Sequence, residues 1–273
     1  MKEQVVRQHT SFIKFLYASL IIAPEAQNVV EDMALFKYRH MCWAMADSKR
    51  AGEEFDGQFN VEEVEQLKKL KTQRELVDYL IADLEANLKT YTEETPTITR
   101  FKTDDSYFLS QLRKLKVEGK ITAFSGNGEL EGVELTEENK NALIFFLMEE
   151  IFKEYELILI YSFYKTYSAN AIANSVFTDL AYDSIYHLKR FGELARELGV
   201  LTLPRVVPLE KYRNEPIIQF LKENIEEERD AEKNCLILAE KIGNPELKEF
   251  LLFISRQEVY HAELLQRALE TLQ

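Results

Sequence analysis

The sequence predicts an all-α protein, and three observations support this fold class. The 273 residues include only 9 Gly and 6 Pro, so few turns interrupt long elements. Apolar residues recur at helical spacing along most of the chain, with charged residues on the opposite face. Apolar residues make up 46% of the chain and charged residues 30%, which is enough apolar material for one large core or two ordinary ones.

The C-terminal part, residues 136–273, predicts four helices in two hairpins. Gly199 ends the second helix, and Gly243 separates the third from the fourth. Between the hairpins, residues 200–216 contain three prolines, which exclude a helix and leave a long crossover. One long crossover between two hairpins is an established layout for four helices. The expected helices, in chain order, are 141–167, 170–198, 216–242 and 246–272.

The N-terminal part, residues 1–117, predicts a second helical bundle. Residues 118–135 hold four of the nine glycines and indicate either a linker or a small β-hairpin. Aligning His40 with His187 brings several identical residues into register, which indicates a tandem duplication or a chance match between two amphipathic helices. The matched pairs are Val29/Val176, Asp32/Asp179 and Ala34/Ala181, and the expected N-terminal helices are 3–22, 25–51, 61–93 and 97–117.

Charge and motifs exclude several classes of function. The net charge of −13 disfavours nucleic-acid binding, because no excess of cations can displace phosphate counterions. No apolar run is long enough to span a membrane, and the N-terminus lacks the layout of a signal peptide. Cys42 and Cys235 are far apart and form no CxxC pair, so we expect a cytoplasmic protein. The sequence contains no phosphate-binding loop, dinucleotide fingerprint, nucleophile elbow or Cys/His zinc cluster.

The chemistry of the chain is indicated by one interval that occurs in both C-terminal hairpins. Glu258 and His261 lie three residues apart, so both side chains project from one face of a helix. Glu228 precedes His261 by 33 residues, and Glu154 precedes His187 by the same 33 residues. A site for two metal ions in a four-helix bundle needs one Glu from each of two helices and a Glu-x-x-His pair from each of the others. The equal intervals fit such a site.

This pattern resembles the ferritin-like superfamily, and especially its rubrerythrin branch, over about 140 C-terminal residues. In that branch the inward Glu is followed by a small or apolar residue three positions later and often by a Tyr seven positions later. The matching residues are Glu154, Leu157 and Tyr161 in the first hairpin and Glu228, Ala231 and Cys235 in the second. The resemblance implies a ferritin-like four-helix bundle in the C-terminal half.

The resemblance also implies a di-iron redox protein that reduces peroxide or carries out ferroxidase-type oxidation. Its small-molecule substrate would be O2 or peroxide, and Mn or Zn could replace Fe as the metal. Rubrerythrins also carry a four-cysteine electron-transfer module; with two cysteines, this chain would need a separate electron donor, and we expect it to form a homo-oligomer. The implied roles are Glu154 and Glu228 as terminal carboxylates, Glu258 as a bridge, His187 and His261 as terminal nitrogens, and Tyr161 as a hydrogen-bond donor to a ligand.

One position departs from the family pattern. Ser184 stands three residues before His187, where the family has a Glu, and Asp183 stands four residues before. Asp183 shares the helix face of His187 and is the candidate to replace the missing bridge. Three outcomes are open: a distorted site for two metal ions that uses Asp183, a site for one ion on the Glu228 and His261 side, or an empty remnant.

The N-terminal half lacks the ligands of such a site. Lys37 takes the place of the bridging Glu, and Arg7 stands 33 residues before His40. Cations at these positions would repel a metal ion, so we expect His9 and His40 to be structural or surface residues. This half would then serve in packing, dimerisation or shielding. The alternative for the whole chain is a metal-free structural or interaction protein derived from a ferritin-like ancestor.

Overall fold

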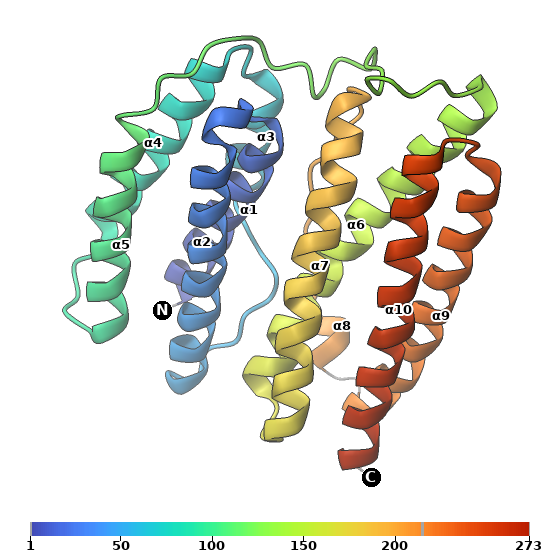
Figure 1. The fold of residues 1–273 in the computed structure, drawn as a ribbon. Helices are drawn as coiled ribbons and strands as arrows, with labels where there is room; N and C mark the ends of the chain where they lie inside the picture. The colour runs from blue at the N-terminus through green and yellow to red at the C-terminus, as the bar shows by residue number, and fades with distance from the viewer. Residues whose placement is uncertain (1, 214–215, 273) are drawn as a thin grey trace. The chain divides into compact units, whose positions relative to one another are not determined.

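The computed structural model describes residues 2–213 and 216–272. Every regular element in these residues is helical, and none of them belongs to a strand (Figure 1). The all-α fold class is therefore confirmed. The chain divides into two units, which are Met1–Gly126 with Leu203–Val207, and Asn127–Thr202 with Pro208–Gln273.

The first unit contains two helical hairpins joined by a long connection. Helices α1 and α2 form one hairpin, and α4 and α5 form the other. Each of these four helices packs against two others, because α1 also contacts α4 and α2 also contacts α5. The bounds are α1 (Lys2–Ile21), α2 (Pro24–Arg50), α3 (Val61–Glu65), the 3-10 helix η1 (Gln66–Lys69), α4 (Gln73–Thr90) and α5 (Pro96–Leu112).

The continuous helix expected over residues 61–93 is wrong. The chain becomes extended at Leu70, and α4 begins only after Thr72. The Thr72 side chain accepts a hydrogen bond from the Glu75 N–H, while Glu75 accepts one from the Thr72 N–H. This capping box satisfies two backbone donors that a helix start leaves without partners, so it fixes a new helix start inside an otherwise periodic stretch.

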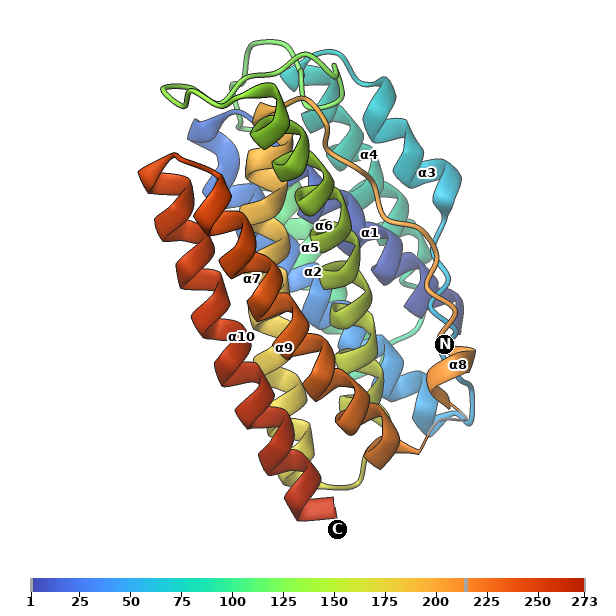
Figure 2. The same ribbon diagram turned by 90° about the vertical axis from the view of Figure 1, so that its right-hand side faces the viewer.

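The second unit repeats the plan of two hairpins and one long connection (Figure 2). Helices α6 and α7 form the first hairpin, and α9 and α10 form the second. Helix α6 also contacts α9, and α7 also contacts α10, so the four long helices enclose a common interior. The bounds are α6 (Glu137–Tyr167), α7 (Ala171–Glu197), α8 (Glu210–Arg213), α9 (Ile217–Lys241) and α10 (Pro245–Leu272).

The helix ends of the second unit follow from local chemistry. Thr136 caps α6 by accepting from the Asn139 N–H, and Asn170 caps α7 in the same way. Gly243, between α9 and α10, has φ +68°, a conformation that strains any residue with a Cβ. The four-residue helix α8 was not expected in the proline-containing crossover. It forms between Pro208 and Pro216, in a stretch without proline.

The glycine-containing stretch 118–135 holds no strand, so the β-hairpin, one of the two alternatives for it, is not found there. Gly128 connects this stretch to the end of α7, because its N–H donates to the Leu198 carbonyl over 3.0 Å. A Cβ at Gly128 would lie 1.8 Å from the Glu197 carbonyl oxygen, so only glycine fits this close approach to the end of α7. None of the described helices is long and apolar enough to cross a membrane.

His9 in the first unit gives a pH-dependent prediction. Its ring is fully buried, and Nδ1 donates to the Gln58 carbonyl over 2.9 Å. Burial lowers the pKa of His9 to about 4, although the Gln58 carbonyl and Asp56 oppose this. An unfolded His binds its proton near pH 6.5, so the stabilisation is present above that pH and is lost as the pH falls towards 4.

We therefore expect the first unit to lose about 2 kcal/mol of unfolding free energy through His9 between pH 7 and pH 5. The chain has a single Trp, Trp43 on α2, so urea unfolding followed by Trp fluorescence reports on this unit. The control variant His9→Gln keeps an N–H donor but does not titrate, and it should show a smaller loss. An equal loss in the variant and the parent would contradict the assignment.

Candidate metal centre

Five ligand-type side chains meet in the interior of the second unit. All are buried, and none is more than 5% exposed. One comes from each of α6, α7 and α9, and two come from α10. Buried carboxylates and imidazoles need partners or a metal ion, because an unpaired buried charge is costly. The five residues are Glu154, His187, Glu228, Glu258 and His261, and the sequence predicted all of them as ligands.

These residues form two overlapping groups. Glu154, His187 and Glu258 each offer one ligand atom, and these atoms lie within 4.8 Å of one another. Glu228, Glu258 and His261 form a second group by the same measure. Glu258 belongs to both, because its Oε1 lies 3.5 Å from Nδ1 of His187 and its Oε2 lies 3.0 Å from Nδ1 of His261. The two oxygens of one carboxylate thus face two adjacent groups of ligands.

Both histidines turn the same ring nitrogen towards the carboxylates. Nδ1 of His187 lies 2.9 Å from Glu154 Oε1, while its Nε2 lies 3.0 Å from Gln257 Oε1. Nδ1 of His261 faces Glu258, and its Nε2 lies 3.1 Å from Asp183 Oδ2. An acceptor at Nε2 keeps the proton on that nitrogen and leaves Nδ1 as the ligand atom. The outer partners therefore leave Nδ1 of both rings facing the carboxylates, where a metal ion in the centre would meet it.

Asp183 does not take the bridging position for which it was predicted. Its carboxylate contacts the outer nitrogen of His261, and its side chain is 36% exposed, whereas the five central side chains are buried. On α7, the next residue, Ser184, occupies the inward face and is buried, while Asp183 lies one position to the side of that face. Asp183 belongs to neither group of ligands. The two groups therefore share one carboxylate, Glu258, and not two.

Tyr161, the predicted hydrogen-bond donor, lies on α6 two helical turns after Glu154. Its hydroxyl lies 3.0 Å from Glu228 Oε1 and 2.7 Å from Asn224 Oδ1. Burial, followed by the charge of Glu228, raises the pKa of Tyr161 well above its usual value. The side chain therefore remains a neutral phenol that can donate a proton or a hydrogen bond beside a ligand.

The protonation of the centre without metal follows from these contacts. Burial alone would lower the pKa of His187, but Glu154 and Glu258 overcome it and raise the pKa to about 9. Burial is likewise overcome at His261, where Asp183, Glu228 and Glu258 raise the pKa to about 12. Burial and the neighbouring Glu228 raise the pKa of Glu258 to about 8. At neutral pH the metal-free centre thus holds protons at positions where a metal ion would bind.

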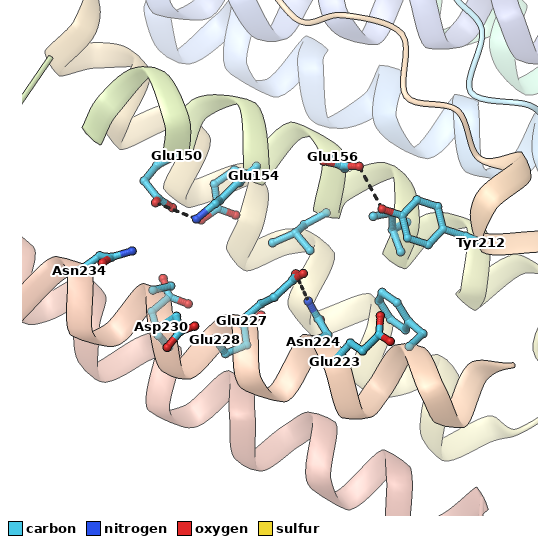
Figure 3. A pocket seen from close by; sticks show the side chains of 16 residues that line it. Glu150, Glu154, Glu156, Tyr212, Glu223, Asn224, Glu227, Glu228, Asp230 and Asn234 are labelled. Atoms are coloured by element: carbon cyan, nitrogen blue, oxygen red, sulfur yellow. Dashed lines mark hydrogen bonds and ion pairs between the residues drawn. The ribbon is translucent and has the colours of Figure 1, made fainter. Parts of the chain in front are cut away.

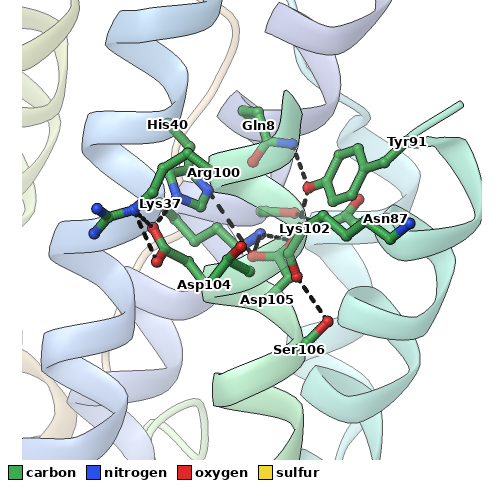
Figure 4. A network of polar contacts seen from close by, with 12 residues as sticks. Gln8, Lys37, His40, Asn87, Tyr91, Arg100, Lys102, Asp104, Asp105 and Ser106 are labelled. Atoms are coloured by element: carbon green, nitrogen blue, oxygen red, sulfur yellow. Dashed lines mark hydrogen bonds and ion pairs between the residues drawn. The ribbon is translucent and has the colours of Figure 1, made fainter. Parts of the chain in front are cut away.

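In the interior of the first unit, two buried lysines pair with carboxylates, and Figure 4 shows one of them, Lys37, beside Asp105. The Lys37 ammonium is fully buried and lies 2.7 Å from both carboxylate oxygens of Asp105. A second buried ammonium, that of Lys14, lies 2.7 Å from Asp83 Oδ1. No group of three close metal ligands was found among the described residues of this unit. His40 is buried as well and contacts Asp104 at 3.1 Å, so His9 and His40 are both internal structural residues.

A pocket of about 480 Å³ leads from the surface of the second unit to the centre, between α6 and α9 (Figure 3). Glu154, Glu228 and Glu258 line its inner part, so the pocket reaches both groups of ligands. The remaining walls carry further carboxylates, one ammonium group, two amides and an apolar surface. This pocket gives small molecules a path to residues that are otherwise buried.

Two residues of the centre were missed in the sequence. Gln257 orients His187, and Asn224 accepts from Tyr161. A signal for Gln257 was present, because it immediately precedes Glu258 as Asp183 immediately precedes Ser184. Gln257 on α10 contacts His187 of the first hairpin, and Asp183 on α7 contacts His261 of the second. A comparison of the two hairpins could have indicated this reciprocal arrangement. Asn224 gave no such signal.

Known proteins add no further assignment. The chain matches no family model, no curated protein and no solved structure. The assignment of the centre therefore depends on its own geometry: five buried ligands in two groups that share Glu258.

Proposed function

We propose that the second unit is a redox protein of the ferritin-like type that binds two divalent metal ions, with iron as the first candidate. The observation that supports this most strongly is the position of Glu258, which belongs to both groups of ligands and turns one oxygen towards the histidine of each. A carboxylate shared in this way is the arrangement that bridges two ions. One group would use Glu154 and His187, and the other Glu228 and His261.

The donor set fits such ions in number, type and charge. Each group supplies carboxylate oxygens and one imidazole nitrogen, which suit iron, manganese and zinc more than calcium or magnesium. Glu154, Glu228 and Glu258 carry three negative charges against the four positive charges of two divalent ions, and Asp183 supplies a fourth through His261. Without metal, the charge is balanced by protons on the histidines, which the ions would displace.

When bound, two iron ions supply two electrons, which is the number that one hydrogen peroxide molecule needs, with two protons, to form two water molecules. The chain's own residues would hold the ions, orient the imidazoles through Gln257 and Asp183, and keep a proton on Tyr161 beside Glu228. The electrons would return from a separate donor, because the sequence has only two cysteines, one on α2 and one on α9.

The proposed reaction is tested by adding peroxide or O2 to protein that was loaded with Fe²⁺ without oxygen. We expect rapid iron oxidation that consumes one peroxide molecule for each pair of ions. Ultraviolet absorption measures its rate. The variant Tyr161→Phe keeps the ring but removes the donor, and it should slow the reaction while iron still binds. Oxidation no faster than that of free Fe²⁺ in the same buffer would refute the redox function.

A further inference from the structure

We propose that the pocket between α6 and α9 binds a small organic cation, an ammonium group on a short hydrocarbon body, next to the metal centre. Its volume of about 480 Å³ lies within the range of small-molecule sites. It far exceeds what O2 or peroxide needs, because a water molecule occupies roughly 30 Å³. The proposed function names only small oxygen species, so the pocket has room for a second and larger ligand.

The charge of the walls determines the sign of this ligand. Outside the metal groups, whose three carboxylates are balanced by the ions or by histidine protons, five carboxylates and one ammonium group, that of Lys153, line the pocket. Lys153 lies 3.4 Å from Glu150, so its charge is already paired. A cavity lined by one sign of charge concentrates ligands of the opposite sign and repels the others. The carboxylates outside the metal groups are Glu150, Glu156, Glu223, Glu227 and Asp230.

These outer carboxylates are not arranged as a further metal site. Among the described residues, the only groups of three close ligands are the two at the centre. Figure 3 shows Glu156 turned towards Tyr212, and Glu227 towards Asn224, with the pocket between them. Carboxylates that are spread around a volume match a ligand with one charged end more closely than a bare ion, which needs converging oxygens.

The apolar part of the lining accommodates the hydrocarbon body. Leu157 and Ile160 line the pocket from α6, and Phe220 lines it from α9. Phe220 and Tyr212 are in ring contact, with centroids 6.1 Å apart, and both line the pocket. Aromatic faces attract cations as well as hydrocarbon, so this end favours an alkylammonium over a hydrated ion. The position beside Glu154 and Glu228 makes the ligand a candidate substrate, an identification that rests on the proposed function.

The test titrates the full chain, with and without Mn²⁺, with three ligands of equal length: hexylammonium, hexanol and hexanoate. We expect hexylammonium to bind about tenfold or more tightly than hexanol, and hexanoate not to bind, as calorimetry would measure. The double variant Glu223→Gln/Glu227→Gln should weaken hexylammonium binding about tenfold. The matched control Glu246→Gln/Glu249→Gln removes two exposed carboxylates of α10 that do not line the pocket, and it should bind like the parent.

Three results would overturn the proposal. The first is binding of hexanoate, since a carboxylate ligand could fill the bridge that is missing at Ser184. The second is the absence of hexylammonium binding to protein whose Mn²⁺ content is measured and complete. The third is displacement of hexylammonium by Mg²⁺ beyond the effect of KCl at equal ionic strength, which would make the pocket a route for metal ions. If hexylammonium binds but no Mn²⁺ does, the proposed metal function fails and the pocket assignment stands.

Discussion

The variant Glu258→Gln should lose both metal ions. Glu258 is the only side chain that belongs to both groups of ligands, since its Oε1 faces His187 and its Oε2 faces His261. An amide supplies one weak oxygen ligand and no charge, so each group would lose its shared donor. Metal analysis after removal of free ions measures the result.

Two comparison variants show whether the loss of metal is specific to the shared position of Glu258. Glu154→Gln removes a ligand from one group only, so we expect it to keep about one ion per chain. Glu249→Gln changes an exposed carboxylate on the same helix, α10, and should keep both ions. Circular dichroism checks that the helices remain in each variant. Full metal content in Glu258→Gln would exclude Glu258 as the bridge.

The second large effect is expected in the first unit, where Lys37→Met should lower the free energy of unfolding by about 3–5 kcal/mol at neutral pH. The substitution leaves the Asp105 carboxylate fully buried without the ammonium that contacts both of its oxygens. Burial raises the pKa of Asp105, so the carboxyl must either remain unpaired or take up a proton. Urea unfolding followed by Trp43 fluorescence measures the change.

The double variant Lys37→Met/Asp105→Asn separates the loss of charge balance from the loss of packing. Asn keeps an oxygen that can accept from the Tyr91 hydroxyl, which now donates to Asp105 over 2.7 Å. With both charges removed, we expect most of the stability to return, because neutral side chains of similar volume often replace a buried ion pair without loss. If the double variant is as unstable as Lys37→Met, the ion pair does not balance the charge in this interior.

The sequence predicted the long helices and the central ligands for the same physical reason. Helical periodicity fixes which residues face inward, so a Glu or His in an apolar row is placed in the interior by the pattern alone. The equal interval of 33 residues then places Glu154 near His187 and Glu228 near His261, and both pairs are found together. The structure adds that Glu258 contacts both histidines.

The structure differs from the expectations where one residue or one local hydrogen bond decides the outcome. Asp183 lies one position from the inward face, and a shift of one residue turns a helical side chain by about 100°. That rotation places its carboxylate on the outer nitrogen of His261. The break in the helix expected over 61–93 depends on the capping box of Thr72 and Glu75, which a periodic pattern does not reveal.

The interior of the first unit was predicted only in part. The sequence indicated that Lys37 would exclude a metal ion, and the ammonium is found buried on Asp105. It did not indicate the second pair, Lys14 with Asp83, because the spacing within a helix gives no information about partners far along the chain. Two buried ammonium groups therefore balance the carboxylates in one unit, while the other unit has carboxylates and imidazoles without lysine at its centre.

The central claim, that the second unit binds two metal ions, is tested most directly by the metal content of the full chain. The protein would be purified without chelator, stripped, incubated with Fe²⁺ without oxygen or with Mn²⁺, and freed of unbound ions before elemental analysis. We expect about two ions per chain, and about none in the variant Glu258→Gln. A metal content near zero after reconstitution would contradict the claim, and it would identify the chain as a metal-free helical protein whose buried histidines are held by the carboxylates and Gln257.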